Sequence, residues 1–266
     1  MPKQKSIVKF KGTMDDMTFY KKKGKYYVRK KGGNDRERIL NDPNFARVRE
    51  NMSEFSAAAK VAAKFRKSIG TLVKQLGGTT VQARLTRIFR KMINSGAGKS
   101  GQRDIQLLPN KLLFSEFQFN EDKNFGSVFT AMVDPPTIDA NRSVVSWEVP
   151  VFDLENELIM PSGTTHYRFV LATTVLSDHM FNEGSGTYVP TTDAAFVKRD
   201  VAYSEYLEAT EPLAAAIPLS TDLGLAEALP DTAISLTVVG VLFYKEVNGT
   251  YLSLKSEQAL ELILAA

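Results

Sequence analysis

The residues of this chain that could do chemistry are few, and no group of them matches a known catalytic pattern. Gly98-Lys99-Ser100 resembles the end of a phosphate-binding loop, but that motif needs a glycine at position 93, which is Ile93. A phosphate-binding loop also follows a strand, whereas a helix is predicted before these residues. We therefore interpret residues 96–101 as a flexible, basic, glycine-rich linker.

The histidines and the acidic side chains give no stronger signal of catalysis. His166 and His179 are thirteen residues apart, without a second metal ligand or a base at a recognisable spacing. Carboxylate pairs such as Asp153 with Glu155 are typical of turns and solvated surfaces. The absence of cysteine excludes disulfides, thiolate metal sites and cysteine nucleophiles. We therefore expect no enzyme and no cofactor; a hydrolase with carboxylates converging in a pocket is a less favoured alternative.

An aromatic and cationic stretch near the N-terminus is the strongest candidate for a binding function. Its aromatic residues are Phe19, Tyr20, Tyr26 and Tyr27, and its cations are Lys21, Lys22, Lys23, Lys25, Arg29, Lys30 and Lys31. Such a pattern can stack on bases and neutralise phosphates. It is equally typical of a β-hairpin whose aromatic face packs inward and whose lysines protect an exposed edge.

The charge of the chain is divided between its two ends. Residues 1–103 carry 26 Lys and Arg against 7 Asp and Glu, a net charge of +19, and residues 104–266 carry 8 against 23, a net charge of −15. A basic end can bind a polyanion, or it can bind the acidic end of another copy. The split favours the second interpretation, because the chain carries its own acidic partner.

The elements that must position the N-terminal residues are a β-hairpin and two helices. Two or three short strands are predicted among residues 7–10, 17–20 and 26–28, with a turn at Lys23-Gly24-Lys25. Asp42-Pro43 predicts the start of a helix that extends toward Leu76. Its apolar seam comprises Phe45, Val48, Met52, Phe55, Ala59, Ala62, Phe65 and Ile69. A second helix follows Gly77-Gly78, is capped by Thr79 or Thr80, and has its apolar face at Val81, Leu85, Ile88, Phe89 and Met92.

From about residue 104 the sequence is typical of a β-protein. Strands are predicted at 113–119, 127–133, 143–149, 165–176, 195–207, 232–247, 249–255 and 259–264, the last being a strand or a short helix. Asn248-Gly249 predicts a type I′ turn, and 205–227 a long loop. The predicted class is therefore α+β: a basic β-hairpin arm (1–40), a helical hairpin with its linker (41–103) and an acidic antiparallel β-sandwich (104–266).

Short motifs are spread from the arm to the last hairpin. They are Phe19-Tyr20-Lys21, Arg49-Glu50-Asn51, Gly101-Gln102-Arg103 and the closing Phe243-Tyr244-Lys245-Glu246-Val247-Asn248-Gly249. With these motifs the chain resembles, over nearly its whole length, a family of uncharacterised bacterial proteins. The resemblance supports the order of the elements and implies no activity, because that family brings no established catalytic residues.

These patterns favour a structural protein that assembles with copies of itself as a filament, tube or shell. Head-to-tail contact between unlike ends closes a ring or propagates a fibre, and the arm can add to a neighbouring sheet. The expected interface residues are Phe19, Tyr20, Tyr26, Tyr27, Lys21, Lys23 and Arg29. The main alternative is a nucleic-acid-binding or packaging protein that uses residues 1–103, with contacts from Lys22, Lys25, Lys30, Arg84, Arg87, Arg90 and Lys91. A carbohydrate- or protein-binding sandwich that does not self-assemble is a third.

The sequence predicts neither a membrane span nor a Sec-type signal. Residues 1–11 mix four lysines with single apolar residues. No later stretch approaches the roughly 20 apolar residues of a membrane-spanning helix. We expect synthesis in the cytoplasm, and a later position outside the cell would need another export route.

Overall fold

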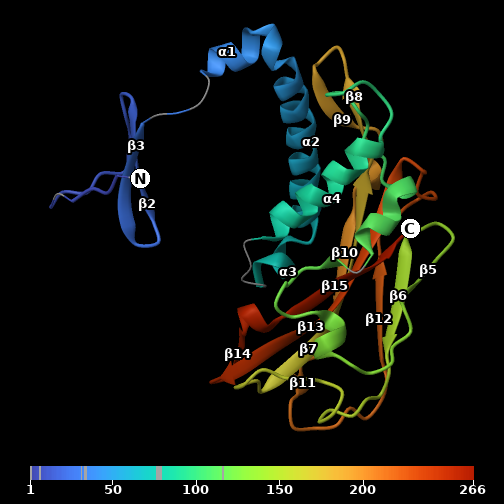
Figure 1. The fold of residues 1–266 in the computed structure, drawn as a ribbon. Coiled ribbons are helices and arrows are strands. Elements are labelled where there is room, and N and C mark those ends of the chain that lie inside the picture. The colour runs from blue at the N-terminus through green and yellow to red at the C-terminus, as the bar shows by residue number, and fades with distance from the viewer. Residues whose placement is uncertain (1, 6, 31, 33–34, 76–79, 116) are drawn as a thin grey trace. The chain divides into compact units, whose positions relative to one another are not determined.

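The computed structural model describes residues 2–5, 7–30, 32, 35–75, 80–115 and 117–266. The chain divides into two compact units, Met1–Arg49 and Glu50–Ala266 (Figure 1). The sequence placed boundaries at residues 40 and 103 instead. The difference arises because most of the helical hairpin shares its hydrophobic core with the β-rich half.

The N-terminal unit contains an antiparallel sheet in the order β1 (Gly12–Met14), β2 (Met17–Lys22) and β3 (Lys25–Lys30). Lys23 and Gly24 have φ values of 48° and 78°, as a type I′ turn requires, and the predicted hairpin is confirmed. The strand predicted at 7–10 is wrong. The Gln4 side chain bonds both the N–H and the C=O of Phe10, and so takes the place of a strand partner.

A short helix, α1 (Arg36–Asn41), follows the sheet and was not predicted. The predicted helix start at Asp42 is confirmed as a 3-10 turn over Pro43–Phe45, because Asp42 Oδ1 accepts the Asn44 N–H at 2.9 Å. The chain then continues as α2 (Ala46–Ser68). Arg49 Nη1 donates to Ile39 O at 2.8 Å and to Asp42 O at 2.9 Å, which ties α1 to the start of α2.

The predicted seam of α2 is confirmed toward the C-terminal end, where Ala62 and Phe65 are buried, and is wrong in the first half of the helix. Glu54, Ala58 and Phe65 are buried, whereas Met52 is 52 % and Phe55 59 % exposed. The buried stripe follows helical spacing through small side chains, which lets the helix approach the sheet closely. The predicted seam was built from the larger apolar residues, whereas the first half of the helix buries Glu54 and the small Ala57 and Ala58.

The second predicted helix is confirmed as α4 (Val81–Ser95), which buries Val81, Leu85, Phe89 and Met92. Thr80 occupies the N-cap position without capping, since its hydroxyl donates to Glu121 at 3.0 Å. A short α3 (Gly70–Gln75) comes between α2 and α4. Leu76, Gly77-Gly78 and Thr79 lie outside the described residues.

The β structure of Glu50–Ala266 is antiparallel. The strands are β4 (Phe117–Gln118), β5 (Thr137–Ile138), β6 (Val144–Val149), β7 (His166–Ser177), β8 (His179–Asn182), β9 (Thr187–Pro190), β10 (Arg199–Tyr203), β11 (Leu207–Glu208), β12 (Ile217–Asp222), β13 (Ala233–Val247), β14 (Thr250–Ser253) and β15 (Ala259–Ala265). The main sheet runs β10-β7-β13-β15-β4, with β11 beside β7 and β14 beside β13. A smaller sheet has the order β12-β6-β5, and β8 pairs with β9. The remaining helical pieces are α5 (Phe125–Val128) and 3-10 turns at Leu108–Phe114, Ala194–Phe196 and Lys255–Glu257.

The α+β class and the sandwich-like arrangement are confirmed, with the helices as an additional layer (Figure 1). Along β7, Val170 and Ala172 pack in the core shared with α2 and α4, whereas Phe169 and Leu171 pack in the core shared with β6 and β12. This alternation follows from the two-residue period of a strand. The main sheet is therefore covered on both faces.

Most strand predictions in this half are confirmed and some are wrong. β6, β7, β13, β14 and β15 lie where strands were expected, and β4 and β10 are shorter than predicted. The strand expected at 127–133 is wrong, because α5 ends there and Phe129 only bridges to Leu158. The region 205–227, expected to be a long loop, contains the strand β12. Pro218 within this strand argued against it in the sequence, because proline disfavours strands. Proline is tolerated because β12 is an edge strand.

The glycine-rich residues 96–101 form a packed turn and not the flexible linker that we predicted. A Cβ added to Gly96 would lie 2.1 Å from Asp104 O, and one added to Gly101 would lie 2.9 Å from Glu50 Cα. The Gly101 N–H also donates to Glu54 Oε1 at 2.8 Å. Glycine is therefore required by close packing as well as by backbone conformation.

We predict that Gly101→Ala destabilises the fold more than Gly163→Ala does. Their φ values are nearly the same, +89° and +85°, but nothing lies within 4 Å of a Cβ at Gly163. The control should lose about 1 kcal/mol from backbone strain alone, and Gly101→Ala roughly 1–3 kcal/mol more from steric overlap. Urea unfolding of both variants measures the difference, and equal losses would contradict the packing argument.

Candidate functional site

The first face of the N-terminal hairpin carries Phe19, Lys21 and Tyr26. Phe19 pairs with Val28 across the two strands, and Lys21 with Tyr26, so these side chains point the same way. The Phe10 ring lies 5.9 Å from the Phe19 ring, and Lys21 Nζ lies 5.5 Å from the Tyr26 centroid. This face combines aromatic surface with a cation.

The second face carries Tyr20, Tyr27 and Arg29. The two tyrosine rings are stacked with centroids 5.7 Å apart, and the Arg29 guanidinium lies 5.8 Å from the Tyr20 centroid. Lys23, the one predicted interface residue that lies on neither face, is in the turn between β2 and β3. The seven predicted residues therefore occupy two opposite faces and a tip, and one flat contact cannot use all of them.

The tip of the hairpin concentrates positive charge. Lys22 and Lys25 are paired directly across the turn that contains Lys23. Like charges at paired positions destabilise a hairpin, and an anionic partner would relieve this repulsion. Lys30, another predicted nucleic-acid contact, pairs with Met17 at the other end of the strands.

Parts of both outer edges of the β2–β3 hairpin are covered by its own chain. β1 pairs with residues 17–19 of β2. Along β3, the Val28 N–H donates to Pro2 O, and the Gln4 N–H donates to Tyr26 O, both at 3.0 Å. These are backbone groups that a neighbouring strand would otherwise bond. The arm therefore offers its faces and tip for contact more than these edges.

The N-terminal unit has no hydrophobic core among its described residues. None of the described side chains of Met1–Arg49 is buried. Its large exposed apolar residues include Ile7, Val8, Phe10, Met14 and Met17. A small sheet with both faces in water gains little from the hydrophobic effect. This unit therefore presents apolar surface that a partner can cover.

Arg84, a predicted nucleic-acid contact, is held by partners within the chain. It donates to the carbonyl oxygens of Gln118 and Phe119 and pairs with Glu121 at 3.1 Å. Its guanidinium also lies 4.9 Å from the centroid of the Phe117 ring. Arg84 therefore fastens α4 to residues 117–121.

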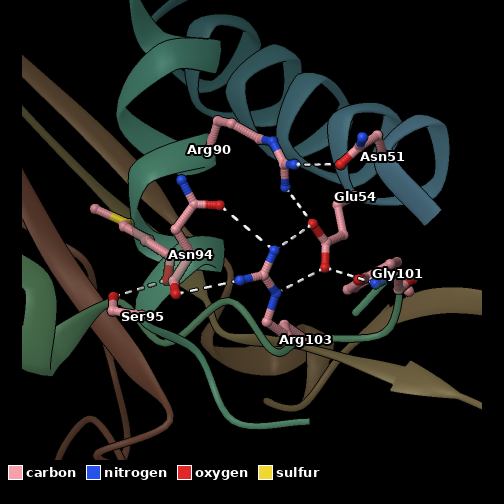
Figure 2. A network of polar contacts seen from close by, with 9 residues as sticks. Asn51, Glu54, Arg90, Asn94, Ser95, Gly101 and Arg103 are labelled. Carbon is pink, nitrogen blue, oxygen red and sulfur yellow. Dashed lines mark hydrogen bonds and ion pairs between the residues drawn. The ribbon is translucent and has the colours of Figure 1, made fainter. Parts of the chain in front are cut away.

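Arg90 belongs to a network centred on Glu54, which is 1 % exposed (Figure 2). Glu54 accepts hydrogen bonds from Arg90 Nη1, from Arg103 Nε at 2.8 Å and from Arg103 Nη2 at 2.9 Å. With the bond from Gly101, this carboxylate joins α2 to α4 and to the packed glycine turn. Arg90 Nη2 also donates to Asn51 at 3.2 Å.

The network determines the charge state of Glu54. Burial by itself would raise the pKa of this carboxyl, but the hydrogen bonds from Arg103, Arg90 and Gly101 outweigh it and lower the pKa to about 2. Glu54 was not among the site residues predicted from the sequence. Its helical spacing to Ala58, Val61 and Phe65 was the available signal.

Arg87 and Lys91 lie one turn apart on the exposed side of α4. Within the described residues neither forms an ion pair. Together with Arg90 they line a groove whose other wall includes Phe55 and Ala59 of α2. Of the predicted nucleic-acid contacts, these three cations are brought together, while those of the arm belong to the other unit.

The two histidines begin different strands, His166 in β7 and His179 in β8, and they do not form a joint site. His166 bonds the Thr165 hydroxyl at 3.0 Å. His179 Nε2 lies 2.9 Å from Lys64 Nζ, and burial together with that ammonium lowers the pKa of His179 to about 4. No group of three or more His, Asp or Glu within the described ranges can hold a metal ion.

Comparison with protein-family models, with curated proteins and with solved structures found no match to this chain. In the described parts of the chain, no helix has the length and apolar character that crossing a membrane requires.

We predict that the contribution of Glu54 to the free energy of unfolding is lost at low pH. Because its pKa is lower in the folded protein than the ordinary value of 4.5, folding favours the ionised form. The contribution is fully present above about pH 5 and declines as the pH falls toward about 2. The shift corresponds to roughly 3 kcal/mol. Urea unfolding of the wild-type protein and Glu54→Gln should show a difference of that order at pH 7 that shrinks toward pH 3; a difference independent of pH would contradict the assignment.

Proposed function

We propose that this chain is a structural protein that assembles head to tail with copies of itself, its N-terminal arm docking on a neighbouring subunit. The observation that carries the proposal is the exposed apolar surface of Met1–Arg49, whose described residues include no buried side chain. Covering this surface on a neighbour supplies the hydrophobic contact that the arm lacks. The product would be a ring, tube, shell or filament.

The charge distribution supports the same proposal. The arm belongs to the end with a net charge of +19, and a neighbour offers a β-rich half with a net charge of −15. Opposite charge steers association and sets its direction, while apolar contacts supply most of the affinity. The proposal places synthesis in the cytoplasm, and a position outside the cell would need an export route other than Sec.

The arrangement of the hairpin suggests a test that distinguishes its two faces. Phe19→Ala/Tyr26→Ala removes the aromatic rings of the first face, and Tyr20→Ala/Tyr27→Ala those of the second. We expect the double substitution on the face that contacts the neighbour to lower the assembled mass at least tenfold, because a few large buried side chains supply most of the binding energy of an interface. The other variant serves as the matched control. Sedimentation at several salt concentrations measures the mass.

Screening should weaken this assembly, so the mass should fall as salt increases. A wild-type protein that stays monomeric at high concentration and low ionic strength would overturn the proposal. Assembly that survives both double substitutions would remove the arm from the interface. Unchanged circular dichroism of the variants would show that Glu50–Ala266 remains folded.

Nucleic-acid binding is the second candidate, because the lysine tip lies beside the stacked Tyr20 and Tyr27 rings. Cations next to exposed aromatic rings are typical of single-strand binders. We expect affinity for single-stranded DNA to fall steeply with salt, and Lys22→Gln/Lys25→Gln to reduce the salt slope by about 2. Fluorescence anisotropy should use the full chain, since α2 and α4 share a core with the β-rich half. No binding at low salt would exclude this function.

A further inference from the structure

A groove of about 740 Å³ between α2 and α4 remains without a role in the fold. Phe55 and Ala59 lie along one wall, and Ala83 lies on the other beside Arg87, Arg90 and Lys91. The lining contains no Asp or Glu. The remaining lining residues are the neutral polar Gln82, Thr86 and Asn94. The groove therefore has a mainly apolar surface with a cationic rim.

Two large apolar side chains of α2, one in the groove lining and one a turn before it, are exposed. Phe55 is 59 % exposed, and Met52, one turn earlier on α2, is 52 % exposed. Because Arg90 already pairs with the buried Glu54, the charges left for a partner are those of Arg87 and Lys91. A fitting partner must offer apolar side chains flanked by carboxylates.

The β-rich half carries a segment with those properties at residues 151–160. Val151 and Ile159 are 57 % and 59 % exposed. Between them lie Asp153, Glu155 and Glu157, and the segment has no Lys or Arg. Its apolar and acidic character is the complement of the groove.

This segment is held in a fixed conformation before any partner binds. Its Phe152, Leu154 and Leu158 side chains are buried. The Ile159 N–H donates to Val128 O at 2.8 Å, and the Glu157 N–H donates to Asp153 O at 2.8 Å. A segment that is already ordered loses little conformational entropy on binding.

The two surfaces cannot meet within one copy. The groove belongs to the helices that pack on one face of the main sheet. The buried side chains of residues 151–160 pack in the core on the other face. A contact between them must therefore join two copies, and it is heterologous, so it repeats from copy to copy.

We propose that the α2–α4 groove receives residues 151–160 of a second copy, with Val151 and Ile159 against Met52 and Phe55 and with Glu155 facing Arg87 and Lys91. This inference rests on the proposed self-assembly and specifies its head-to-tail contact. The basic arm is a poor occupant of the groove, because its lysines would face Arg87 and Lys91. A nucleic acid would leave the apolar floor uncovered.

A charge-exchange experiment tests the contact. The groove variant is Arg87→Glu/Lys91→Glu, and the segment variant is Glu155→Lys. Each alone places like charges across the contact, and we expect at least tenfold weaker assembly in sedimentation at low salt. An equimolar mixture should recover wild-type assembly to within a few-fold, because in an alternating chain every groove then faces a segment of opposite charge.

Matched controls separate this contact from effects of net charge. Lys74→Glu/Lys111→Glu and Glu183→Lys make the same charge changes at exposed sites elsewhere in Glu50–Ala266, and they should assemble as the wild type does. Thermal unfolding should be the same for all variants. If both charge-reversed variants assemble as the wild type does, or if their mixture does not recover assembly, the groove assignment is overturned while self-assembly stands. A groove variant that loses only its affinity for single-stranded DNA would assign the groove to nucleic acid, and a monomeric wild type would overturn self-assembly itself.

Discussion

The pair of central strands, β7 and β13, is buried on both faces along most of its length, and this burial determines the rest of the second unit. A strand presents alternate side chains to opposite faces, so two separate layers must exclude water from it. α2 and α4 supply one layer, and β6 with β12 supplies the other. The basic helices and the acidic segment 151–160 are consequently held on opposite sides of one sheet. A charge division along the sequence thereby becomes a division across the sheet in Glu50–Ala266.

The helical layer depends in turn on a buried charge. Glu54 is the point at which α2, α4 and the glycine turn meet, and its two arginine partners compensate its burial. A buried carboxylate without such partners would be costly, so the network specifies one orientation of α2. That orientation directs Ala58, Val61 and Phe65 to the sheet and leaves Met52 and Phe55 in solvent. The exposed groove is therefore a consequence of the hydrogen bonds that Glu54 accepts from Arg90, Arg103 and Gly101.

The N-terminal unit follows a different rule. Local turn chemistry and pairing with its own chain give it a defined sheet, yet its described side chains form no core. Elements of this size need another surface for stability. The proposed docking of the arm and the proposed groove contact both use surfaces that one copy leaves open. They differ in kind, since the arm contributes half-buried aromatic side chains on two faces of a small sheet and the groove is a cavity between two packed helices.

The sequence by itself determined the features that depend on neighbouring residues. These include the Lys23-Gly24 and Asn248-Gly249 turns, the Asp42 cap, the long strands β7 and β13, the α+β class and the charge division. Only the tertiary structure decided which side of α2 is buried, that residues 96–101 are packed, and that Arg84 and Arg90 have partners within the chain. Turns, caps and strand periodicity are set by interactions over a few residues. The other features depend on partners far apart in the sequence, such as Glu54 and Arg103, and no local pattern contains that information.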